Sequence, residues 1–169
     1  MKFVLWYLVS YISNAMEVCP GEGPRYGDFK CNHDLTHRVC AILLDEAGQP
    51  IRWGGNGTFW DMTNQKRFQW DDRIRGEPNV GNGWCICMWA FAQMIETLGC
   101  TNTQLHCNAT DIAHVLKSYS EEGITGIKDL AESKRCLATK CPNEYTAAVN
   151  DVSGGGAPED LVHAVHGEL

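Results

Sequence analysis

The apolar positions of the chain change their period along its length, and this change predicts a mixed fold. Residues 37–44 are apolar at both odd and even positions, which predicts a central strand buried on both faces. Residues 45–50 are typical of a turn, and residues 51–53 are predicted to pair back as a hairpin.

Helical spacing of apolar residues appears in the second half of the chain. It predicts a helix over residues 85–98, with Gly99 at its C-cap. A second helix is expected to begin near Asn108 or Thr110, which are both good N-caps, and a third to run from about residue 125 to 137. The fold class expected is α+β, with a small central β-sheet and two to three helices packed on it.

A long irregular loop is expected between these regions, over residues 54–83, because glycine-rich turns interrupt any period there. Large aromatic side chains in and beside this loop must pack against something. They are expected either to lie in the core or to contact a partner protein, and the candidate contact residues are Trp53, Phe59, Trp60 and Trp70.

The two ends of the chain differ in composition from residues 16–150, which are expected to form a single globular domain. Residues 1–15 contain one lysine, a short apolar run and small residues, which is typical of a signal peptide or a retained apolar anchor. Residues 3–9 are too few to span a bilayer, but they are a candidate membrane or membrane-complex contact. Residues 151–169 are expected to be a glycine-rich linker and tail.

Charge and motifs exclude several function classes. The net charge of −7 and the pI near 5.3 argue against a nucleic-acid partner, which would require a basic face. The glycine-rich segments lack the residues of a phosphate-binding loop, so no cofactor is expected.

Nine cysteines in 169 residues are too many for an ordinary cytosolic protein of this size, and they favour a disulfide framework. The odd number leaves at least one thiol without an intrachain partner. The local pairs Cys100/Cys107 and Cys136/Cys141 are expected to close short loops, each contributing about 2–3 kcal/mol. The disulfide candidates are Cys19, Cys31, Cys40, Cys85, Cys87, Cys100, Cys107, Cys136 and Cys141.

Several signals indicate an address in the secretory pathway, either the ER lumen or the exterior. The leader and the cysteines agree with the sequons at Asn56 and Asn108, which predict a glycoprotein. The last four residues, 166–169, are similar to an ER-retention signal. The alternative address is that of a lumenal or peripheral subunit of an organellar membrane complex.

Four segments together resemble the domain-of-unknown-function family numbered 2237, which consists of small, mostly bacterial proteins. They are the Cys-Pro at residues 19–20 with the turn at 26–31, the His-x-Val-Cys-Ala run at 37–41, the Trp-Cys-x-Cys run at 84–87 and the Ala-Thr pair at 109–110. The resemblance covers roughly residues 17–120. It implies an α+β fold and a cysteine centre, but no reaction.

Three chemical uses of the cysteine centre remain open beside a purely structural one. A structural zinc site would use His37, Cys40, Cys85 and Cys87, with Cys31 or His33 as a further ligand. A thiol–disulfide oxidoreductase or redox sensor would use Cys85 and Cys87 as an exchange-active pair. A Cys/His hydrolase would pair Cys40 or Cys85 with His37 or His114.

The function expected first is not enzymatic. Because no complete catalytic set is visible, the chain is expected to be a disulfide-stabilised lumenal protein that binds a protein partner or serves as an accessory subunit. The thiol–disulfide oxidoreductase is the first alternative and the zinc protein is the second.

Overall fold

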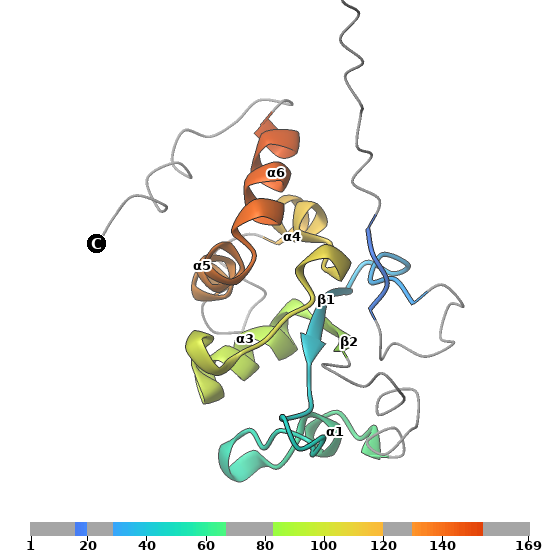
Figure 1. Ribbon diagram of the computed structural model, residues 1–169, viewed down its shortest axis with the longest axis vertical. Helices are drawn as coiled ribbons and strands as arrows, with labels where there is room; N and C mark the ends of the chain where they lie inside the picture. The colour runs from blue at the N-terminus through green and yellow to red at the C-terminus, as the bar shows by residue number, and fades with distance from the viewer. Residues whose placement is uncertain (1–15, 20–28, 67–82, 120–129, 154–169) are drawn as a thin grey trace, which may run out of the picture.

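The computed structural model describes residues 16–19, 29–66, 83–119 and 130–153. Figure 1 shows a small sheet at the centre with helix α3 (Met88–Leu98) beside it, helices α4 (Ile112–Ser118), α5 (Leu130–Lys140) and α6 (Pro142–Ser153) gathered at one end, and the short helix α1 (Phe59–Met62) at the other. The expected leader, Trp70 and most of the tail lie outside the described residues. The expected fold class is confirmed, since the described residues form an α+β structure held by cysteine pairs.

The sheet consists of two antiparallel strands, β1 (His37–Ile42) and β2 (Gly83–Cys87). On the other edge of β1, the Ile42 amide donates to the Gln104 carbonyl at 3.0 Å and the His106 amide donates to the Cys40 carbonyl at 3.0 Å. The prediction of a central buried strand is therefore confirmed, because β1 has neighbours on both edges and its four middle residues are buried.

The turn after β1 forms as expected. The Asp45 amide donates to the Gln49 carbonyl at 2.8 Å, and the Ile51 amide donates back to the Leu43 carbonyl at 2.9 Å. The segment that follows is not irregular throughout, because a 3-10 turn η1 (Gly54–Asn56) and a short helix α1 (Phe59–Met62) lie within residues 54–66.

The helix expected over residues 85–98 begins later, because residues 83–87 are strand β2. Helix α3 (Met88–Leu98) starts directly after Cys87, which is its N-cap. It ends at Gly99, whose φ of 75° lies in the region that favours glycine. Cys85 and Ile86 pair with β1, and this non-local pairing overrides the helical spacing of the same residues.

Helix α4 (Ile112–Ser118) follows two 3-10 turns, η3 (Cys100–Asn102) and η4 (Cys107–Ala109). Its N-cap is Asp111, so the expected caps Asn108 and Thr110 are wrong. The Thr110 hydroxyl is used elsewhere: it accepts from the Cys40 amide and donates to the His106 carbonyl, both at 3.0 Å.

Two helices complete the described fold, α5 (Leu130–Lys140) and α6 (Pro142–Ser153). The third expected helix corresponds to α5, but residues 120–129 lie outside the described residues. Helix α6 was not expected, and it extends into residues 151–153, which were assigned to the tail. It packs against α4 and α5, and α5 packs against α3.

The hydrophobic core contains side chains from the sheet, from α1 and from helices α3 to α6. Its largest fully buried side chains include Trp53, Trp60 and Phe91. The ring centroids of Trp60 and Trp84 lie 5.2 Å apart, and those of Phe59 and Trp60 lie 5.1 Å apart, both in edge-to-face geometry. Trp53, Phe59 and Trp60 are therefore interior residues, and their expected role as partner contacts is wrong.

Candidate functional site

Four disulfides fix the N-terminal segment and the helical end of the fold. They join Cys19 to Cys40, Cys31 to Cys85, Cys100 to Cys136, and Cys107 to Cys141. The expected local pairs Cys100/Cys107 and Cys136/Cys141 are therefore wrong. Because α5 packs beside α3, each of these four cysteines lies next to a cysteine that is distant in the sequence. It does not bond to the sequence-near cysteine that its spacing had suggested.

The ninth cysteine, Cys87, is a free thiol. It is half-buried and stands where β2 ends and α3 begins. The expected exchange pair of Cys85 and Cys87 is not formed, since Cys85 is bonded to Cys31 and is buried.

Directly across the sheet from Cys87 lies His37, its register partner in β1. The ladder has a register shift between His37 and Val39, so this pair lies at a bulge and not in regular antiparallel geometry. The strand pairing nevertheless brings the backbones of a cysteine and a histidine that are 50 positions apart in the chain to the same end of the sheet.

The turn before β1 holds the imidazole of His37 in place. Its Nδ1 lies 2.7 Å from Oδ2 of Asp34, and the His37 amide donates to Oδ1 of Asp34 at 2.7 Å. When Nδ1–H donates to the carboxylate, Nε2 of the neutral ring is left as an acceptor. Nucleophile–base–carboxylate sites require this tautomer of the base.

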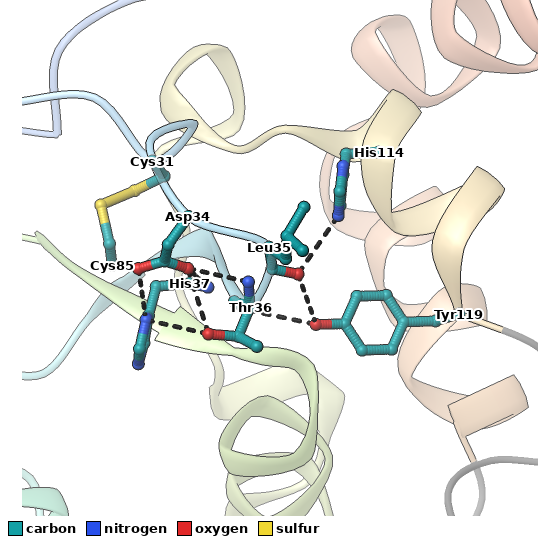
Figure 2. Close-up of polar contacts among 8 residues, drawn as sticks. All are labelled: Cys31, Asp34, Leu35, Thr36, His37, Cys85, His114 and Tyr119. Carbon is teal, nitrogen blue, oxygen red and sulfur yellow. Dashed lines mark hydrogen bonds and ion pairs between the residues drawn. A yellow bond between two sulfur atoms is a disulfide. The ribbon is translucent and has the colours of Figure 1, made fainter.

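Two residues from the α4 region support the same turn, as Figure 2 shows. The Tyr119 hydroxyl donates to the Thr36 carbonyl at 3.3 Å, and Nε2 of His114 lies 3.3 Å from the Leu35 carbonyl. His114 therefore contacts the backbone of this turn and is not placed as a base for Cys40 or Cys85.

The electrostatics of this site, defined by Cys87, His37, Asp34 and Tyr119, favour neutral forms of the thiol and the phenol. Burial raises the pKa of Cys87, and Asp34 raises it further. The backbone amides of Ala90, Cys87 and Trp89 lower this pKa, although the Cys87 side chain makes no capping hydrogen bond to α3. Burial and the neighbouring Cys87 raise the pKa of Tyr119.

Asp34 behaves in the opposite way. Burial favours its neutral form, but the hydrogen bonds from the His37 and Thr36 amides and from the His37 ring outweigh burial and hold its pKa well below the ordinary 3.8. Asp34 is therefore a carboxylate over the whole neutral range, as an orienting partner for His37 must be.

This shift makes stability depend on pH. A carboxyl with a lowered folded-state pKa contributes stability that is complete above its unfolded value and is lost as the pH falls through the folded value. We expect Asp34→Asn to reduce the free energy of unfolding at pH 7, and the difference from the wild type to shrink as the pH falls below about 3.8. Urea unfolding from pH 7 to pH 2 measures it. Asp151→Asn, an exposed position in α6, is the control, and a constant difference across this range would contradict the assignment.

A second group of sulfurs lies beside the site and is buried. Sγ atoms of Cys19, Cys31 and Cys85 all lie within 4.8 Å of one another, and Cys40 is bonded to Cys19. The neighbouring Gly83 must lack a side chain, because a Cβ there would lie 2.4 Å from Sγ of Cys40 and 2.9 Å from Sγ of Cys19. The expected zinc set of His37, Cys40, Cys85 and Cys87 is wrong in this form, since Cys40 and Cys85 are in disulfides.

The expected hydrolase pairs fail for the same reason, because neither Cys40 nor Cys85 has a free sulfur. Sequence reasoning named Cys87 as half of a redox pair and, with His37, as a member of a zinc set, but it did not pair the two as nucleophile and base. Two signals were available: the odd number of cysteines, and the position of Cys87 directly before a helical period.

The surface also has a pocket that is separate from the thiol site, and two exposed apolar side chains that lie next to the site in the chain. A pocket of about 670 Å³ between Glu17, the start of α4 and α6 is lined in part by the exposed sequon residue Asn108, but by none of the thiol-site residues. Leu35 is 77% exposed and Trp89 is 47% exposed, and each neighbours the site in the chain. Among the described residues, no helix has the length and apolar character needed to cross a membrane.

No family model matches the chain, and neither the curated proteins nor the solved structures contain a match. The resemblance to the family numbered 2237 therefore has no support from these comparisons.

Proposed function

We propose that this protein is a thiol-dependent acyl-transfer catalyst in which Cys87 is the nucleophile and His37 is the base. The observation that carries the proposal is the register pairing of the single free thiol with an imidazole whose Nδ1 is bonded to Asp34. Nucleophile, base and orienting group in this order form the arrangement that activates cysteine and serine nucleophiles on unrelated folds.

The proposed reaction balances with these groups alone. Nε2 of His37 takes the proton from Sγ of Cys87 as the sulfur attacks a carbonyl carbon, and a C–S bond forms. The carbonyl–leaving-group bond then breaks, and the leaving group departs with the proton from His37. Water or an acceptor amine attacks the resulting thioester and releases the thiol.

Two environmental features fit these roles. Because the pKa of Cys87 is raised, the thiol is protonated at neutral pH and requires a base during attack. The backbone amides of Ala90, Cys87 and Trp89 at the start of α3 lower the pKa of the sulfur, and they are the groups proposed to donate to the developing oxyanion.

A second candidate is thiol–disulfide exchange, the reaction class predicted from Cys85 and Cys87. The observation that favours it is the position of the free thiol two residues from Cys85 of the Cys31–Cys85 disulfide. In that reaction the Cys87 thiolate would attack a disulfide of the substrate and expel one of its sulfurs as a thiolate. A thiolate of the substrate would then attack the mixed disulfide and release Cys87.

The address and the partner stay proposals as well. Four disulfides are compatible with an oxidising compartment, in line with a secretory or lumenal address. A role as a binding protein or accessory subunit keeps only one of its four aromatic contact candidates, Trp70, which lies outside the described residues, since Trp53, Phe59 and Trp60 are interior.

The test uses p-nitrophenyl acetate as an acyl probe. We expect the wild type to acquire an acetyl group on Cys87, detected by mass spectrometry of the unreduced protein, and Cys87→Ser to acquire none there. His37→Gln should slow acetylation about 10²–10⁴-fold, the contribution typical of a positioned base. His33→Gln, in the same turn, is the matched control and should react like the wild type.

The pH profile separates catalysis from simple exposure of the sulfur. With His37 as base, the acetylation rate of the wild type and that of His37→Gln should depend on pH differently, because only the wild type has an imidazole that can accept the proton of the thiol. Asp34→Asn, which alters the positioning of His37, should lower the rate while keeping a pH dependence that differs from that of His37→Gln. An acetylation rate that follows only a thiol titration in all three proteins would overturn the proposal. A mixed disulfide formed with oxidised glutathione, in the absence of acetylation, would favour the exchange reaction.

A further inference from the structure

The two disulfides nearest the sheet bring four sulfurs to one place. Cys40 and Cys85 are register partners on β1 and β2, and each is bonded to a cysteine from the N-terminal segment. Three of the four sulfurs lie within 4.8 Å of one another, and the fourth is bonded to one of these three. All four residues are at most 3% exposed.

From this geometry we infer that the reduced protein binds one zinc ion through Cys19, Cys31, Cys40 and Cys85. Four thiolates around Zn²⁺ at about 2.3 Å are separated from one another by about 3.8 Å in a tetrahedron. Three of the four sulfurs already lie within 4.8 Å of one another and the fourth is bonded to one of them, so opening each disulfide has to separate its two sulfurs by only about 2 Å to reach that arrangement.

The surroundings fit a closed structural site better than a catalytic one. Four protein sulfurs complete the coordination of zinc and leave no position for water. The ion would join the segments containing Cys19 and Cys31 to the two strands, which is the connection that the disulfides make in the oxidised protein. His37 and Cys87, members of the zinc set predicted from sequence, are not in this sulfur group.

The conversion requires two molecules of a dithiol reductant for each protein chain. Each dithiol opens one disulfide and leaves as a cyclic disulfide, so that four protein thiols are formed. Zinc then binds as the thiols lose four protons, and binding is therefore favoured by higher pH. The newly synthesised chain, whose disulfides have not yet formed, meets the same requirement without a reductant.

The experiment reduces the full-length protein with dithiothreitol, which also opens the two disulfides of the helical end, and removes the reductant without oxygen. The reduced protein is then titrated with zinc and separately with cobalt, so that metal binding is coupled to folding. We expect one zinc per chain, and a cobalt complex with the charge-transfer and ligand-field bands of a tetrahedral tetrathiolate site. Cys19→Ser should weaken apparent zinc affinity by more than the roughly 10–100-fold that loss of an outer-shell partner costs.

Two variants are matched controls. Cys87→Ser and the double variant Cys100→Ser/Cys136→Ser remove cysteines outside the group and should retain the cobalt spectrum. The inference is overturned if the reduced wild type binds no zinc, if its cobalt spectrum indicates fewer than four thiolates, or if Cys87→Ser abolishes binding. Because the wild-type spectrum counts the ligands, the test holds even where Cys19→Ser fails to fold. The acyl-transfer proposal concerns other residues and is unaffected by any of these outcomes.

Discussion

A variant that lacks both disulfides of the helical end is expected to lose about 7 kcal/mol of unfolding free energy. Cys107–Cys141 closes a chain with a sequence separation of 34, and a loop of that length contributes about 4 kcal/mol in the chain-entropy estimate. Once it is closed, Cys100–Cys136 closes a second loop of about 14 residues, formed by segments 100–107 and 136–141. That second loop contributes about 3 kcal/mol.

The physical reason is that both bonds join the region before α4 to α5 and its end. Without them the unfolded chain gains the freedom to separate these segments, while the folded contacts of α5 with α3 remain. A loss of this size is comparable to the whole stability of many domains. We therefore expect the variant with alanine at positions 100, 107, 136 and 141 to be largely unfolded at 25 °C.

Urea unfolding followed by far-UV circular dichroism measures the effect. The variant Cys100→Ala/Cys136→Ala keeps one bond and should lose only about 3 kcal/mol, so the prediction holds even if the fourfold variant never folds. Cys87→Ala removes a cysteine but no bond and is the control. Peptide mapping without reduction that found Cys100 joined to Cys107 would contradict the pairing.

Asp111→Ala is expected to cost about 4 kcal/mol, the second-largest effect, because this one carboxylate has two tasks. Its Oδ2 accepts from Nη1 of Arg38 at 2.6 Å, and its Oδ1 accepts from the His114 amide at 3.1 Å as the N-cap of α4. Arg38 is 8% exposed, and its Nε has no hydrogen-bond partner within the part of the chain that the structure describes.

Alanine at position 111 leaves the buried guanidinium without its counter-ion, which costs about 3 kcal/mol, the low end of the usual range because the Asp111 side chain is 18% exposed. Loss of the helix cap adds about 1 kcal/mol. Asp111→Asn keeps the cap but loses the charge, so it should be about 1 kcal/mol less damaging than alanine.

The double variant Arg38→Met/Asp111→Asn separates charge burial from packing. Removing both charges leaves no unpaired ion, so its stability should return most of the way to that of the wild type. Chemical unfolding at pH 7 of the wild type, both single Asp111 variants and the double variant supplies the comparison. A double variant as unstable as Asp111→Asn would show that the ion pair is not the source of the loss.

Local signals in the sequence predicted individual elements well where neighbouring residues decide the conformation. Gly99 ends α3 as expected, and the turn after β1 forms where Asp45 and Gly48 favour it. Local signals failed where a distant partner decides. Residues 85–87 were predicted to begin a helix but belong to a strand because β1 supplies hydrogen bonds, and the Thr110 hydroxyl is bonded to Cys40 instead of capping α4.

The same distinction applies to the candidate site. Its residue types were visible in the sequence, and Cys87, His37 and the cysteine centre were all named there. Their combination was not visible, because 50 positions separate His37 from Cys87 and no spacing rule relates a residue of β1 to its partner in β2.

The sequence by itself determined the α+β class, the dependence on cysteine cross-links and the presence of one thiol in excess, since these follow from periodicity and from an odd count. Only the tertiary structure decided which sulfurs bond, which aromatic residues are interior and which cysteine lies opposite His37 in the sheet. Periodicity and capping act over a few residues along the chain, whereas disulfide pairing and strand register depend on distances in space that only the packed fold sets.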